Sequence, residues 1–137
     1  YLEASMTHAS LKKYQQTNKS AAQQASPYQL VAMLFQKLLG NIATAKCAIS
    51  QNDFAKKGSE ISNAIAIIGV LDGSLDFKQG GEVSENLASI YKFCSDELFL
   101  ASAENDCEKL DEIIQVLLPI KAGWDSIPFE NQKQVSF

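Results

Sequence analysis

The sequence is poor in histidine, and this scarcity excludes several classes of catalytic protein. His8 is the only histidine among 137 residues, and it lies in a polar segment near the start of the chain. A catalytic triad, a helical phosphotransfer domain or a di-iron bundle needs histidine on a central element. Because no such constellation can be assembled, we expect no enzyme activity, no metal and no cofactor.

Cysteine is also scarce, and the three that occur form no recognisable motif. Cys47, Cys94 and Cys107 are widely spaced, odd in number and never arranged as Cys-x-x-Cys. We interpret them as reduced, mostly buried thiols of a cytosolic protein. The chain lacks both an apolar run of the roughly 20 residues that a membrane helix needs and the basic-then-apolar start of a secretory signal. We therefore expect no membrane insertion and a location in the cytosol.

Charge of either sign is sparse, and basic residues never form a dense run. The 12 Lys and Arg residues and 16 Asp and Glu residues give a net charge of −4, so a nucleic-acid partner is not expected. Hydrophobic residues make up 46% of the chain, which is ordinary for a globular protein. The length fits one domain.

The sequence does contain a helical pattern of apolar residues, with clear signals for the ends of the helices. Apolar residues recur at three- and four-residue steps, and strict apolar alternation is absent. The predicted breaks between helices lie at Ser26-Pro27, Asn52-Asp53, Gly80-Gly81 and Asn105-Asp106. Because short connections favour antiparallel neighbours, we predict an all-α fold, an antiparallel up-down four-helix bundle with an additional short N-terminal helix or cap segment.

The chain divides into three parts. We expect an N-terminal cap segment and linker at 1–25, the helical bundle domain at 26–127 and a disordered tail at 128–137. Another interpretation of residues 1–5 is a cloning remnant, because Met6 would be a natural start.

Several details of the helices can be predicted. Pro119 should kink the last helix near 115–118, and three glycines inside the third helix suggest close packing or local softness. Tyr91 and Trp124 are expected in the core. The three glycines are Gly58, Gly69 and Gly73. The buried face of the fourth helix is expected to include Val83, and three further apolar residues are expected to broaden it: Phe93, Phe99 and Leu100.

Two features suggest partner binding rather than catalysis. The helix that begins at Pro27 carries an apolar stripe over more than half its circumference, which needs two neighbouring helices or one neighbour and a ligand. Leu11 and Tyr14 stand alone in polar sequence on one helix face. They fit either a short helix that covers the bundle for stability alone or a removable cap over a ligand groove.

Five stretches of the sequence are distinctive. The most specific combines Ser74-Leu75-Asp76 with Gly80-Gly81-Glu82 and Asn86-Leu87. The others are Leu11-Lys12-Lys13-Tyr14, the segment 25–35 around Ser26-Pro27, the segment 55–68, and the segment 110–127, which closes on Trp124-Asp125-Ser126-Ile127. In this order and spacing they resemble the FliS family of flagellin-specific export chaperones, over nearly the whole domain.

The resemblance implies a cytosolic bundle that binds the C-terminal segment of flagellin in an apolar groove. It also implies that the bundle prevents premature polymerisation and supports delivery to components of the flagellar export gate, without a cofactor or a metal. By position, Leu11 and Tyr14 match N-terminal residues of the family that support flagellin binding. From the helix faces we place the groove at residues that would equally fit a plain core: Leu30, Leu34, Leu38, Ile65 and Ile68.

A second hypothesis stays open at this point. The broad apolar faces also fit a structural or adaptor bundle that associates with itself and binds no flagellin. Under the first hypothesis the protein is expected to be a monomer or a weak dimer.

Overall fold

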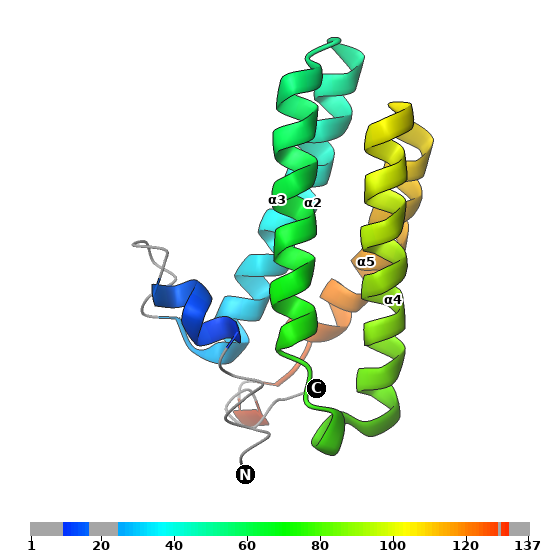
Figure 1. Cartoon of the computed structure of the whole chain (residues 1–137). Helices are drawn as coiled ribbons and strands as arrows, with labels where there is room; N and C mark the ends of the chain where they lie inside the picture. Colours follow the sequence, from blue (N-terminus) through cyan, green and yellow to red (C-terminus); the bar gives the residue numbers. More distant parts are fainter. Residues whose placement is uncertain (1–9, 17–24, 129, 132–137) are drawn as a thin grey trace.

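The computed structural model describes residues 10–16, 25–128 and 130–131. Four long helices run alternately up and down (Figure 1), and a shorter helix over residues 10–16 precedes them. The long helices are α2 (Pro27–Ser50), α3 (Phe54–Gly73), α4 (Phe77–Glu104) and α5 (Cys107–Asp125). Within these described ranges every regular element is helical, so the predicted all-α bundle with a short N-terminal helix is confirmed.

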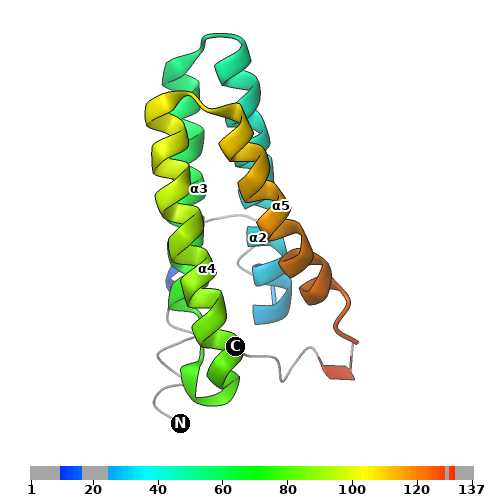
Figure 2. The ribbon, with the colours of Figure 1, turned by 90° about the vertical axis from the view of Figure 1, so that its right-hand side faces the viewer.

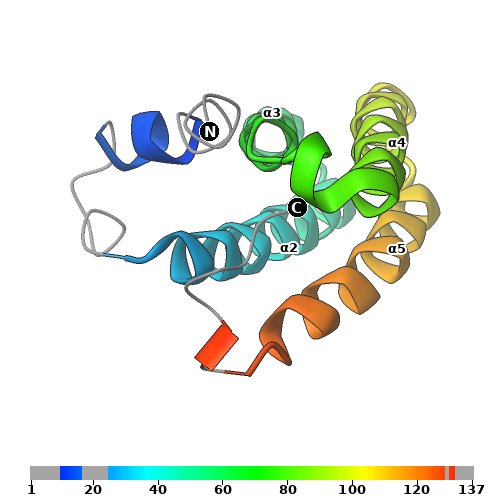
Figure 3. The same cartoon turned by 90° about the horizontal axis from the view of Figure 1, so that it is seen from below.

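The four long helices form a closed ring around one core. α3 packs against α2 and α4, and α5 packs against the same two helices, as the view along the bundle shows (Figure 3). The core is built from buried aliphatic residues of all four helices, together with Phe35, Tyr91 and Trp124. The expectation that Tyr91 and Trp124 belong to the core is therefore confirmed.

Local capping sets most of the helix ends. Ser26 forms a capping box at the start of α2, and Asp53 and Asp106 accept the backbone N–H three residues on, at 3.2 and 3.1 Å. Asn52 and Asn105 adopt φ angles of 58° and 53°, a left-handed conformation that asparagine tolerates well. The breaks predicted at these three connections are confirmed.

The α3–α4 connection differs in detail from the prediction. α3 ends at Gly73, and Asp76 caps a helical turn that already begins at Phe77. Gly81, with φ 50° and ψ −122°, then bends α4, and the Ser84 hydroxyl donates to the Asp76 carbonyl at 2.9 Å across this bend. Gly81 therefore interrupts the helix where a break was predicted, and the difference is the additional helical turn from Phe77 that Asp76 starts before the glycines.

α5 continues through Pro119 to Asp125 at the lower end of the bundle. Its last turns lean toward the start of α2 (Figure 2). There the Trp124 ring stacks on Tyr28, with centroids 5.4 Å apart, and its Nε1 donates to the Tyr28 carbonyl at 3.1 Å. The kink near 115–118 stays a prediction.

Several predicted burials were wrong. Val83, Phe93, Phe99 and Leu100 are exposed, because α4 has only two helical neighbours and the bundle covers a narrower face than the apolar pattern suggested. Phe99 is the extreme case at 69% exposure.

The cysteines are free but less buried than expected. Cys94 is buried, Cys107 is half-buried and Cys47 is exposed, because its position on α2 points away from the core. Of the three glycines of α3, Gly73 alone is closely packed. A Cβ at Gly58 or Gly69 would meet nothing within 4 Å.

Some predictions concern residues outside the described ranges. These are His8, residues 1–5, the linker at 17–24 and most of the predicted tail, namely residues 129 and 132–137. In the part of the chain that the structure describes, no helix combines the length and the apolar character needed to cross a membrane.

Candidate functional site

An open groove of about 430 Å³ lies between α3 and α4. These two helices run side by side on the same face of the bundle (Figures 1 and 3). The α3 wall consists of Ile65, Ile68, Gly69 and Asp72, and the α4 wall of Ala88, Tyr91, Lys92 and Ser95.

Small residues create this groove, and apolar ones make its floor. Gly69 has no side chain, and a Cβ built there would meet nothing within 4 Å. Ala88 on the facing wall adds only a methyl group. Ile68 and Tyr91 are buried and Ile65 is half-buried. The two helices thus leave room for inserted apolar side chains, the arrangement used by proteins that accept a partner helix.

The two charged side chains of the groove differ in whether they form an ion pair. Lys92 forms an ion pair with Asp96, with Nζ and Oδ2 3.0 Å apart, on its own helix. Partial desolvation raises the pKa of the Asp72 carboxyl, and no ion pair to Asp72 occurs among the described residues. Burial raises the pKa of the Tyr91 phenol, and the charges of Asp72 and Cys94 raise it further. One uncompensated carboxylate therefore stands beside an apolar floor.

The N-terminal helix of residues 10–16 is docked on the other side of α3, away from α4 (Figure 3). Leu11 is 5% exposed and belongs to the core, and Tyr14 packs against that core in a half-buried position. The burial of these two apolar side chains against α2 and α3 explains why a polar segment forms a helix here.

Polar contacts and one glycine fix the position of this helix. The Ser10 hydroxyl donates to the Val70 carbonyl at 3.2 Å, and Gln15 Nε2 donates to the Ala25 carbonyl at 2.9 Å. A Cβ at Gly73 would lie 2.9 Å from Ser10 Oγ and 3.1 Å from Ser10 Cβ. The close approach of the N-terminal helix to α3 therefore depends on glycine at this position.

The predicted site residues fall into three groups. Ile65 and Ile68 come together in the groove, whereas Leu11 and Tyr14 lie on the opposite side of α3. The third group is buried in the bundle itself, at 1% exposure or less, and consists of Leu30, Leu34 and Leu38. Contact of these three leucines with a partner stays a prediction.

Sequence reasoning missed that α4 supplies half of the groove. It treated Tyr91 as core only and assigned no role to Asp72 or Lys92. The available signal was the combination of small residues, Gly69 on one helix and Ala88 on the next, at positions where two antiparallel helices would face each other.

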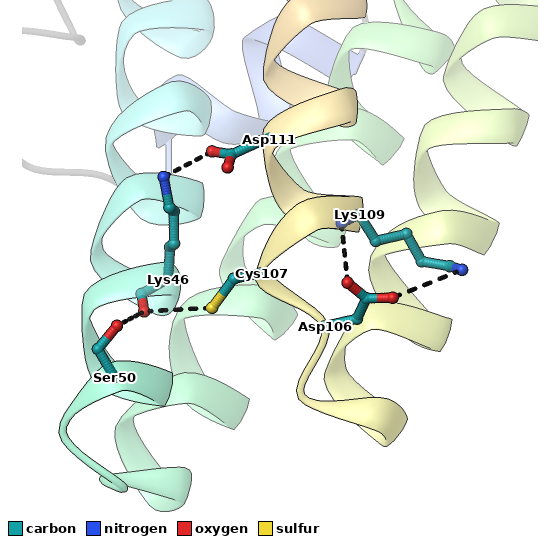
Figure 4. Close-up of polar contacts among 6 residues, drawn as sticks. All are labelled: Lys46, Ser50, Asp106, Cys107, Lys109 and Asp111. Atoms are coloured by element: carbon teal, nitrogen blue, oxygen red, sulfur yellow. Dashed lines mark hydrogen bonds and ion pairs between the residues drawn. The ribbon is translucent and has the colours of Figure 1, made fainter.

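The opposite face of the bundle, between α2 and α5, is held closed by polar contacts (Figure 4). Lys46 Nζ lies 2.6 Å from Asp111 Oδ1, and this hydrogen bond raises the pKa of the lysine. The Cys107 thiol donates to the Lys46 carbonyl at 3.8 Å. Over the ranges given above, no cluster of three or more His, Cys, Asp or Glu side chains could hold a metal ion.

A family model described as flagellar protein FliS matches residues 10–131. The chain belongs to the FliS family. The matched region contains the N-terminal helix and both walls of the groove. The resemblance found in the five sequence stretches is thereby confirmed, and the expectation of a non-enzymatic protein agrees with membership in this chaperone family.

Three curated relatives support the assignment. The flagellar secretion chaperone FliSB of Pseudomonas aeruginosa is 38% identical over 118 residues, which cover 85% of this chain and 94% of that protein. The flagellar secretion chaperone FliS of Salmonella typhimurium is 34% identical over 123 residues, covering 88% and 91%. FliS of Vibrio cholerae is 33% identical over 106 residues, covering 77% and 78%.

Proposed function

We propose that this FliS-family chain is a flagellar secretion chaperone of the bacterial cytosol that binds the C-terminal segment of flagellin. Binding keeps the segment from polymerising before export and supports its delivery to the export gate. The observation that carries this proposal is the open apolar groove between α3 and α4 in a chain whose relatives are flagellar secretion chaperones.

The groove suits a client that is disordered when free and helical when bound. Such a segment loses several kcal/mol when it becomes ordered, so it needs extended apolar contact. Each fully buried aliphatic side chain contributes roughly 1.5–3 kcal/mol. The floor formed by Ile65, Ile68 and Tyr91 offers part of that contact.

The N-terminal helix is a second candidate contact. Leu11 is held firmly, but Tyr14 is only half-buried and faces the boundary between the helix and the core. Two side chains bury enough apolar area for only a few kcal/mol. We propose that this helix is a second, reversible contact for the client on the side of α3 away from the groove, and that Tyr14 supports client binding.

Calorimetric titration with a peptide of the flagellin C-terminal segment tests the proposal. We expect saturable binding at micromolar concentration and a stable monomer or weak dimer by light scattering. Absence of heat and of co-elution at micromolar concentration would reject it. A stable dimer without peptide affinity would favour the self-associating adaptor, which the exposed Phe93 and Phe99 would then explain.

Two variants localise the binding. Ile65→Asn should weaken peptide binding about tenfold or more, corresponding to the loss of one apolar side-chain contact of ~1.4 kcal/mol. Phe93→Asn is the control, because Phe93 is exposed on α4 and does not line the groove. Tyr14→Ala should weaken binding while changing the melting temperature little. A large fall in melting temperature with unchanged affinity would show that Tyr14 is purely structural.

A further inference from the structure

Asp72 occupies a position that is unfavourable for the stability of the bundle. It lies in the last turn of α3, which ends at Gly73, where the negative end of the helix dipole disfavours a carboxylate. Its side chain is exposed to solvent, yet partial desolvation raises its pKa, and it has no ion pair among the described residues. The helix dipole and the partial desolvation thus both disfavour a charge here.

Two acidic side chains at other helix contacts of the bundle have a cationic partner. Asp111 pairs with Lys46 of α2, and Glu97 pairs with Lys109 at 3.8 Å. The groove contains one cation, Lys92, and this cation pairs with Asp96 outside the groove lining. The carboxylate of Asp72 is therefore the charge of the groove that a partner would have to satisfy.

A partner that covers the groove would remove more water from Asp72. A carboxylate that loses water without gaining a donor is strongly unfavourable, whereas a lysine or arginine beside it compensates the loss. A client segment with an acidic or apolar side chain at this point would bind more weakly than one with a basic side chain. Charge complementarity therefore restricts which segment the groove accepts.

We propose that Asp72 is a specificity-determining anchor of the groove, and that the client is an amphipathic helix that places apolar side chains on Ile65, Ile68 and Tyr91 and a lysine or arginine beside Asp72. This inference rests on the proposed function, because it assigns a polar determinant to the same groove. It adds a requirement that an apolar groove alone does not impose, namely one basic residue at a defined place in the client.

The first experiment compares peptide affinity at two salt concentrations. Asp72→Asn removes the charge and keeps the shape, and Glu112→Gln is the matched control, because Glu112 is an exposed acid of α5 outside the groove. At 50 mM NaCl we expect Asp72→Asn to weaken binding of the flagellin C-terminal peptide roughly three- to tenfold. The control should change the affinity less than about twofold. At 500 mM NaCl the difference between the two variants should be smaller, because salt screens the attraction between Asp72 and the basic client residue.

The second experiment identifies the basic partner and separates function from stability. Each lysine or arginine of the peptide is replaced by glutamate in turn, and Asp72→Lys should recover affinity for one of these peptides alone. Thermal unfolding of Asp72→Asn should occur at an equal or higher temperature than in the wild type, because a carboxylate is removed from the end of α3. A merely structural role predicts a lower one.

The outcomes distinguish the two proposals. If the wild type binds the peptide and Asp72→Asn matches Glu112→Gln, the anchor is rejected and the proposed function stands. If no charge-reversed peptide is rescued by Asp72→Lys, the assignment of a basic client residue is rejected. If the wild type binds no flagellin peptide, the proposed function fails and the anchor fails with it.

Discussion

At the scale of single residues, burial separates side chains of the same type. Cys47 is exposed on α2, whereas Cys94 is fully buried in α4. Desolvation raises the pKa of the Cys94 thiol to about 11, and the nearby Glu97 carboxylate adds to the shift. Cys94 therefore acts as a small apolar core residue at neutral pH, and the fold favours its protonated form.

This preference predicts a loss of stability at high pH. The folded-state pKa of Cys94 is raised, so its contribution is complete below the unfolded-state pKa near 9 and is lost as the pH rises toward about 11. The loss should be on the order of 2 kcal/mol, since each pKa unit corresponds to about 1.4 kcal/mol. Urea unfolding between pH 8 and pH 11 measures it.

Cys94→Ala provides the control for this pH dependence. Its free energy of unfolding starts lower, because a buried sulfur is lost, but it should fall less steeply between pH 9 and pH 11. Buried Tyr91 also favours its protonated form in both proteins, and because the Cys94 charge adds to its pKa shift, the difference between the two curves includes this smaller effect as well. Parallel curves for the two proteins would contradict the assignment.

At the scale of elements, single glycines decide how helices bend and how closely they approach. Gly81 lets α4 bend at a φ of 50°, which a side chain would strain. Gly73 instead has ordinary helical geometry. Glycine is needed there for space, because Ser10 of the N-terminal helix lies where a Cβ would be. The docking of residues 10–16 thus depends on a residue more than fifty positions away.

Gly73→Ala should release the N-terminal helix without weakening α3. Alanine is favoured over glycine inside a helix by up to ~1 kcal/mol, which partly offsets the lost burial of Leu11, so the melting temperature should fall only modestly. The added Cβ would meet Ser10 at 2.9–3.1 Å and push the short helix away. Trypsin should then cleave more rapidly after the exposed Lys12 and Lys13.

Gly58→Ala is the matched control for this experiment. It makes the same substitution in the same helix, at a position where a Cβ meets nothing within 4 Å. We expect its cleavage rate to equal that of the wild type. Equal rates for Gly73→Ala as well would show that the helix tolerates the added methyl group.

At the scale of the whole molecule, one core holds all four long helices and the N-terminal helix together. The upper end is fastened by Lys57 of α3, whose Nζ donates to the Ser102 carbonyl at 2.8 Å and to Asn105 Oδ1 at 2.7 Å at the end of α4. The lower end is fastened by the Tyr28–Trp124 stack. The groove lies between α3 and α4, on the face of the bundle opposite the contact between α2 and α5.

Leu38→Ala tests whether the central leucines of α2 act chiefly as core. Leu38 is 0% exposed, so its truncation should lower the free energy of unfolding by roughly 2–5 kcal/mol. Phe99→Ala removes a larger side chain that is 69% exposed, and it should cost less than about 0.5 kcal/mol. Denaturant unfolding measures both. A small effect of Leu38→Ala would indicate that the leucine contributes more to partner contact than to the core.

The sequence by itself determined where the helices begin and end, because capping and turn formation involve residues only a few positions apart. Ser26, Asp53 and Asp106 satisfy nearby backbone N–H groups, so their role can be recognised from the sequence alone. The same holds for the helical periodicity, which made the all-α bundle predictable. Asp76 was missed because the Gly80-Gly81 pair that follows it gave the stronger local signal.

The tertiary structure decided which apolar residues are covered and where a groove remains. An apolar stripe on one helix does not tell how much of it the neighbours will bury, so Phe93 and Phe99 were wrongly placed in the core. The groove likewise requires that Gly69 and Ala88 of two different helices face each other. Such coincidences depend on the packing of distant segments, because the free energy of burial belongs to the contact between helices and not to either helix alone.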